Sequence, residues 1–222
     1  MRDIDEVYKE VFGYRPDEKA EVFILRMPGF APINSDSESR EFIDEDFVDA
    51  CRVGDVSRFC QDPYNTDVER MCNAMCEMGD LGVGMLTGRT SGFSEKAFSN
   101  IIDVCLQRTD NPIVAYDLLR AMIYNEMRYT GKEVCLVDGI FNSLYVDENV
   151  AHVNVVFDSC IFSEVEVACE VGDKVGITLK NCSIERLIGV ASVSDLESIL
   201  EIQNCDIIEV SGDVDTNKDI LD

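Results

Sequence analysis

Four short segments in the last third of the chain decide the fold: Leu136–Phe141 (LVDGIF), Phe157–Phe162 (FDSCIF), Leu179–Ile184 (LKNCSI) and Ile202–Ile207 (IQNCDI). They align without gaps, and their first residues lie 21, 22 and 23 residues apart along the chain. A nearly constant period of this length is typical of structural repeats that stack on one another. We therefore expect this part of the chain to be built from stacked units.

Each segment follows the same chemical pattern. A large apolar residue comes first, a solvent-facing residue second and a turn-forming residue third, and the fourth position is small, as in Gly139 and Cys160. Apolar residues then recur at alternate positions, which predicts β-strands because successive side chains of a strand point to opposite faces. We predict a short β-solenoid of about four coils over residues 132–212, in which each coil adds one rung to a shared sheet.

The chain before residue 130 shows helical periodicity. Apolar residues recur every three or four positions in several stretches, which predicts amphipathic helices; these stretches cover about 4–12, 16–27, 42–53, 55–60, 65–78, 93–108 and 112–128. The expected fold class is thus α+β, with a helical domain over 1–130, a β-solenoid over 131–212 and an acidic flexible tail over 213–222. We expect the helical part to cover the first coil.

The composition excludes several function classes. The 222 residues include 19 Lys and Arg against 44 Asp and Glu, so the formal charge is −25. Such a chain repels phosphate backbones and anionic lipids, which argues against direct binding to nucleic acid or membrane. No apolar run is long enough to span a bilayer, and the N-terminus lacks the basic start of a secretory signal. We therefore expect a cytoplasmic protein, in which the ten cysteines are reduced and mostly buried.

Three sequence features suggest chemistry, and each has a simpler structural explanation. The glycine-rich stretch 82–90 lacks the Lys of a phosphate-binding loop, so we expect a loop that connects helices. Cys72 and Cys76 are four residues apart but have no second pair nearby, and the Cys160, Cys182 and Cys205 column fits a stacked core better than a metal site. His152 is the single histidine and has no nucleophile motif beside it. We expect no cofactor and no metal.

Acidic residues are the remaining candidates for a functional surface. Those near the start of the third predicted helix and those on the coils could contact a basic protein surface, and we take them as candidate partner-binding residues: Asp44, Glu45, Asp46, Asp49, Asp158, Glu164 and Glu166. The carboxylates on the coils also leave open a glycan-cleaving enzyme that uses an acid pair.

One region resembles a known family. Residues 39–59, followed by Asp62-Pro63-Tyr64 and 81–84, are similar to the region that follows the ATPase core in bacterial STAND/NACHT-type NTPases, and residues 25–30 resemble the end of the winged-helix part that precedes it. The resemblance implies a helical connector and a repeat-containing sensor tail of a defence or signalling switch. This chain has no Walker A lysine and no Walker B strand, so ATP hydrolysis does not carry over.

Together these observations predict a non-enzymatic recognition or regulatory module. Its expected partner is a protein with a basic surface or an ATPase domain. Two alternatives stay open at this point: a carbohydrate-active enzyme that uses carboxylates on the coils, and an acidic protein that mimics DNA in a basic groove.

Overall fold

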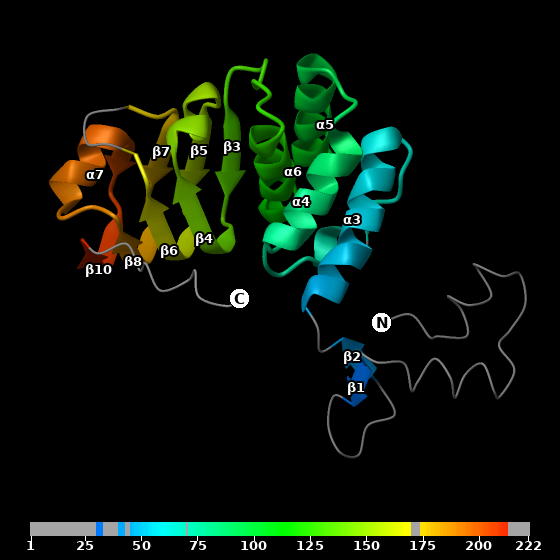
Figure 1. Ribbon diagram of the computed structural model, residues 1–222, viewed down its shortest axis with the longest axis horizontal. Coiled ribbons are helices and arrows are strands. Elements are labelled where there is room, and N and C mark those ends of the chain that lie inside the picture. The colour runs from blue at the N-terminus through cyan, green and yellow to red at the C-terminus, as the bar shows by residue number, and fades with distance from the viewer. Residues whose placement is uncertain (1–29, 33–39, 43–44, 70, 170–173, 213–222) are drawn as a thin grey trace, which may run out of the picture. The chain divides into compact units, whose positions relative to one another are not determined.

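A computed structural model describes residues 30–32, 40–42, 45–69, 71–169 and 174–212 (Figure 1). The chain divides into two compact units, Met1–Asp49 and Ala50–Asp222. In the first unit, strands β1 (Phe30–Pro32) and β2 (Arg40–Phe42) pair antiparallel. The helices expected over 4–12 and 16–27 and the expected tail over 213–222 lie outside the described residues.

Helices form the first part of the second unit. Helix α3 (Glu45–Gln61) starts before the unit boundary, and it is followed by the short 3₁₀ helix η1 (Met71–Asn73), α4 (Asp80–Thr90), α5 (Glu95–Arg108) and α6 (Pro112–Tyr124). The helices predicted near 93–108 and 112–128 are confirmed by α5 and α6. Their starts have clear physical causes, because Ser94 caps α5 by accepting from the Ala97 N–H, and Asn111 caps α6 ahead of Pro112.

Three of the helical predictions are wrong. Helix α3 runs through Gly54, where we expected a break, and the glycine-rich stretch expected as a loop forms α4. Residues 65–69 and 71–78 contain turns and the short helix η1 in place of the expected α-helix. A glycine in a helix costs only about 1 kcal/mol relative to alanine. The burial of Val83 and Leu86 on α4 can offset that cost, since this helix packs against α6.

Eight strands follow and form two four-stranded parallel sheets. The first sheet has the order β3-β5-β7-β9 and the second has the order β10-β8-β6-β4. The strands of the first sheet are β3 (Val134–Val137), β5 (Val155–Asp158), β7 (Ile177–Lys180) and β9 (Glu201–Gln203). Those of the second sheet are β4 (Ile140–Val146), β6 (Ile161–Val167), β8 (Ser183–Ile188) and β10 (Asp206–Ser211).

The expected β-solenoid with one shared sheet is wrong, because the strands form two separate sheets that lie side by side (Figure 1). Each repeat is divided by a residue with left-handed backbone geometry, with φ between 52° and 58°, so that it contributes one strand to each sheet; these residues are Asp138, Ser159, Asn181 and Asn204. Asn, Asp and Ser are the residue types suited to such a turn. The connections η2 (Glu148–His152) and α7 (Val193–Ile199) further interrupt the repeats. The fold remains α+β overall.

The aligned sequence positions are neighbours in the sheets. Leu136 pairs with Phe157, which pairs with Leu179, and the next neighbour is Ile202. In the second sheet, Phe141 and Phe162 hold the equivalent column. The rings of Phe157 and Phe162 meet edge to face with centroids 5.1 Å apart. Apolar side chains from both sheets therefore share one core, and the alternate residues of each sheet point to opposite outer faces.

Helix α6 covers the β3/β4 end of the two sheets (Figure 1). The Tyr116 ring packs on Phe141 with centroids 4.8 Å apart, and its hydroxyl donates to the Ser143 carbonyl at 3.1 Å. The Ser143 N–H donates to Glu77 Oε1 at 2.7 Å. Two side chains thus occupy the N–H and the carbonyl of Ser143, which β4, as an edge strand, would otherwise leave unpaired.

Candidate functional site

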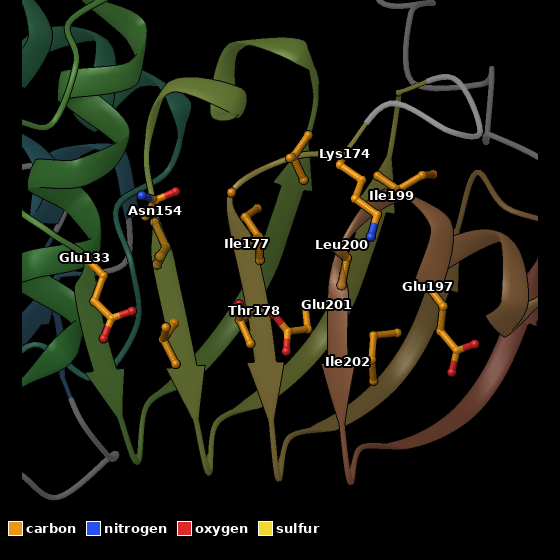
Figure 2. Close-up of a pocket in the computed structure, with 14 residues that line it drawn as sticks. Glu133, Asn154, Lys174, Ile177, Thr178, Glu197, Ile199, Leu200, Glu201 and Ile202 are labelled. Carbon is orange, nitrogen blue, oxygen red and sulfur yellow. The ribbon is translucent and has the colours of Figure 1, made fainter.

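A groove of about 560 Å³ crosses the outer face of the β3-β5-β7-β9 sheet (Figure 2). Its lining comes from all four strands or the residues next to them and from α7, so that segments far apart in the sequence contribute to it. Figure 2 places Glu133 at one side of the groove and Glu197 of α7 at the other, with Thr178 and Glu201 between them.

The strand register determines which side chains face the groove. Val156 pairs with Thr178, and Thr178 pairs with Glu201, so these three residues form one row across the outer face. Their neighbours along each strand, such as Ile177, point into the core and are buried. The alternation of a parallel strand therefore puts an apolar residue, a hydroxyl and a carboxylate side by side on the exposed face.

Gly176 allows two strands to approach closely at the groove. Its carbonyl accepts from the Val155 N–H at 2.7 Å. A Cβ at this position would lie 2.4 Å from the Val153 carbonyl oxygen and 2.7 Å from Asn154 Oδ1. Any other residue would therefore force the backbone of the groove to shift.

The charges of the groove are mainly negative. Glu133, Glu197 and Glu201 supply three carboxylates, and Lys174 supplies one ammonium group. All four side chains are exposed, so they can reach a bound molecule without first losing a buried partner. Cationic groups are the natural complement of such a surface.

Asp158 lies on the same outer face as the groove but not in its lining. Its Oδ1 accepts from Asn181 Nδ2 at 2.9 Å and from Ser159 Oγ at 3.1 Å. The hydrogen bond from Asn181, followed by that from Ser159 and the charge of Lys180, lowers the pKa of this carboxyl. Asp158 is therefore an ionised residue that also stabilises the turn between β5 and β6.

Glu164 and Glu166 lie on β6 of the other sheet. Glu164 forms an ion pair with Arg186 of the neighbouring strand β8. Because the two sheets face each other through the core, Asp158 and Glu164 point to opposite outer faces. The structure therefore does not bring Asp158 together with the two glutamates.

The candidate acids near the start of α3 are described only in part. Asp44 lies outside the described residues, and Glu45 and Asp46 belong to the first turn of α3, where only the backbone is described. Asp49 is buried, with 6% of its surface exposed. Asp49 therefore adds little to an exposed acidic surface.

The cysteines are less buried than expected. All ten are free thiols, of which four are buried: Cys60, Cys105, Cys160 and Cys182. Cys72 and Cys76 are exposed. Cys160 and Cys182 donate to the carbonyls of Leu136 and Phe157 at 3.4 Å, so they serve as core residues of the repeats. Within the described residues, no three His, Cys, Asp or Glu side chains are grouped to hold a metal ion.

Cys135 is an exposed thiol that lies beside the groove. It pairs with Val156 in the outward row and is exposed. Partial burial, and then the charges of Asp158 and Glu133, raise its pKa. The side chain stays a thiol at neutral pH, which makes it a poor nucleophile. His152 is the last residue of η2, and nothing is described of its side chain.

Sequence reasoning missed a buried ionic cluster between the helices and the sheets. Asp117 of α6 is fully buried and accepts from Arg52 Nη2 at 2.7 Å and from the Met78 N–H at 2.8 Å. Glu77 lies in the same cluster, and its buried Oε2 has no hydrogen-bond partner among the described residues. A sequence signal did exist, because Asp117 and Arg120 are the only charged residues in a helix that is otherwise almost entirely apolar.

The sequence indicated the groove less clearly than it indicated the buried ionic cluster. Thr178 and Glu201 occupy outward positions of the repeats, but Glu197 comes from α7, which we did not predict. The groove residues could therefore not be assembled from the alignment of the repeats alone.

We compared the chain with protein-family models, with curated proteins and with solved structures, and none of them matches it. The resemblance to STAND/NACHT-type NTPases and the cytoplasmic location therefore stay predictions. In the described part of the chain, no helix combines the length and apolar character that crossing a bilayer requires.

Proposed function

We propose that the chain is a non-enzymatic recognition module that binds a lysine- or arginine-bearing segment of a protein partner in the groove of the β3-β5-β7-β9 sheet. The observation that carries this proposal is the placement of Glu133, Glu201 and Glu197 across one exposed groove. Carboxylates spaced along a groove can pair with successive cationic side chains of one peptide segment.

The floor of the groove supports a peptide rather than a small cation. Val156 and Ile202 contribute apolar atoms to its lining, while Thr178 and Asn154 contribute hydrogen-bonding groups. A peptide can use both kinds of contact, whereas an inorganic cation would use only the carboxylates. The lining of the groove also runs from Glu133, next to β3, to β9, which is more than a single ion needs.

The groove offers little support for catalysis. Among its described lining residues there is no histidine, no cysteine and no serine. Glycan cleavage by a pair of carboxylates is less well supported than binding, because Asp158 and Glu164 lie on different outer faces of the two sheets. The ATPase-domain partner and the DNA-mimic alternative stay predictions, because no contact among the described residues supports either of them.

Selection from a random peptide library displayed on phage, with the full chain immobilised, tests the proposal. We expect the selected peptides to be enriched in Lys and Arg and to bind more weakly as the salt concentration rises, because exposed ion pairs are screened. The double variant Glu197→Lys, Glu201→Lys should bind them about tenfold more weakly or worse.

Glu185→Lys is the matched control, since Glu185 is an exposed glutamate on the other sheet. The proposal fails if the selected peptides lack basic residues, or if the groove variant and the control variant bind them equally well. It also fails if no peptide is selected over an unrelated acidic protein.

A further inference from the structure

The two ends of the sheet pair differ in how their edge strands are covered. At the β4 end, Glu77 and Tyr116 bond the backbone of Ser143, and α6 packs alongside. At the other end, β10 pairs only with β8, and β9 pairs only with β7, within the described residues. No strand of the described residues pairs with the far side of β10, so that its backbone groups there can pair with an added strand.

The exposure of the inward-facing residues points to the same conclusion. Leu144, Val165, Leu187 and Val210 form one column across the second sheet. The first three are 3% exposed or less, whereas Val210 is 39% exposed. Ile207 is likewise only partly buried, although Phe141, Phe162 and Ile184 of its column are fully buried. Strand β10 therefore has apolar residues at inward positions, but among the described strands it has a neighbour on one side only.

The charge of this edge indicates what kind of neighbour fits. Asp206 and Glu209 are exposed on β10, and this strand contains no lysine or arginine. The register partner of Glu209 is Arg186 of β8, which forms an ion pair with Glu164 of β6. A second copy of the chain would bring the same carboxylates against each other and would add to a net charge of −25. A segment with basic residues would instead meet opposite charges.

We propose that the β10 edge binds an extended segment of a partner protein as a fifth strand, and that this segment alternates apolar and basic residues. Its backbone continues the β10-β8-β6-β4 sheet. Its apolar side chains cover Ile207 and Val210, and its Lys or Arg side chains pair with Asp206 and Glu209. This surface belongs to the sheet that does not carry the groove, so the inference stands independently of the groove.

The test uses the full chain and a short synthetic peptide of alternating lysine and valine, with a fluorescent label for anisotropy titration. A second peptide has the same charge but contains prolines in place of alternate valines, which removes backbone donors needed in a sheet. We expect the first peptide to bind at least about tenfold more tightly than the second. Amide hydrogen exchange of residues 206–211 should slow on binding, because the exposed backbone becomes paired.

Two variants locate the binding surface. Glu209→Lys should weaken binding of the lysine–valine peptide by about tenfold or more. Ile140→Lys is the control, because Ile140 is also exposed on an outer face of the same sheet but lies at the covered end. This variant should bind as the wild type does.

Three results would overturn the inference. The peptides could bind equally well, which would mean that charge alone attracts them. The lysine–valine peptide could fail to bind. Sedimentation could instead show a dimer that Glu209→Lys strengthens or leaves unchanged, which would assign the edge to a second copy of the chain.

Discussion

Asp117 is a charged residue that is completely buried. Its carboxyl is surrounded by the core of the helical part and is reached by Arg52, 65 residues earlier in the chain. Burial raises its pKa to about 7, although the charge of Arg52 and the Met78 N–H act in the opposite direction. The cost of burying the charge therefore exceeds the attraction of the nearby cation.

Replacing Asp117 should strongly destabilise the protein. Asp117→Ala removes the buried carboxylate that accepts from Arg52 and from the Met78 N–H, and we expect a loss of about 3–5 kcal/mol in the free energy of unfolding. Urea unfolding followed by circular dichroism measures this loss. Asp80→Ala is the control, because Asp80 pairs with Arg120 while 90% of its side chain is exposed, and it should cost less than about 1 kcal/mol. Equal effects of the two variants would contradict this account.

The raised pKa of Asp117 also predicts a pH dependence. The native state holds this proton more tightly than the unfolded state, so the contribution of Asp117 to stability is present below about pH 4 and is lost as the pH rises through about 7. The variant Asp117→Asn has no carboxyl group at this position, so its stability lacks this pH dependence. The free energy of unfolding of the wild type should therefore fall relative to that of the variant between these two pH values. A constant difference across this range would show that the pKa is not raised.

The glycines of this chain differ in whether another residue could replace them. Gly54 lies within α3, where an added Cβ would meet no atom within 4 Å. Gly189 lies just after β8 at a φ of +87°, where an added Cβ would lie 2.1 Å from the Val167 carbonyl oxygen. Sequence reasoning placed breaks at glycines in the helical part, because it could not tell a tolerated glycine from a required one. Only the tertiary contacts separate the two cases.

The two glycines should respond in opposite ways to alanine. Gly54→Ala should stabilise the protein by about 0.5–1 kcal/mol, because alanine has the higher helix propensity and there is space for its methyl group. Gly189→Ala should destabilise it by more than about 1 kcal/mol, since the backbone geometry and the close carbonyl both exclude a side chain. Thermal unfolding of the two variants measures both effects. The interpretation fails if Gly189→Ala is neutral.

For the molecule as a whole, the repeat pattern was the strongest signal in the sequence. The alignment of four segments correctly placed Leu136, Phe157, Leu179 and Ile202 side by side. It did not show that the position after each solvent-facing residue, such as Asn181, takes left-handed geometry and divides the repeat between two sheets. Side-chain type alone makes this turn possible but does not determine which sheet the following strand joins.

The candidate site was less predictable than the fold. Asp158, Glu164 and Glu166 were expected from their place on the repeats, but the strand register separates them between two outer faces. The groove depends on α7 and on the close strand approach at Gly176, neither of which a repeat alignment reveals. The net charge of −25 favours a basic partner, which stays a prediction, and it does not indicate which surface such a partner would bind.

We propose that carboxylates of the groove pair with basic residues of a bound peptide, and an exchange of charges between the two tests this pairing directly. Binding of a selected lysine-containing peptide is measured against the wild type and Glu201→Lys, and each chain is then titrated with the same peptide carrying glutamate in place of one lysine. We predict that Glu201→Lys loses affinity for the original peptide and regains it for one of the glutamate-substituted peptides, which the wild type binds weakly. Undiminished binding of the original peptide by Glu201→Lys would contradict the account.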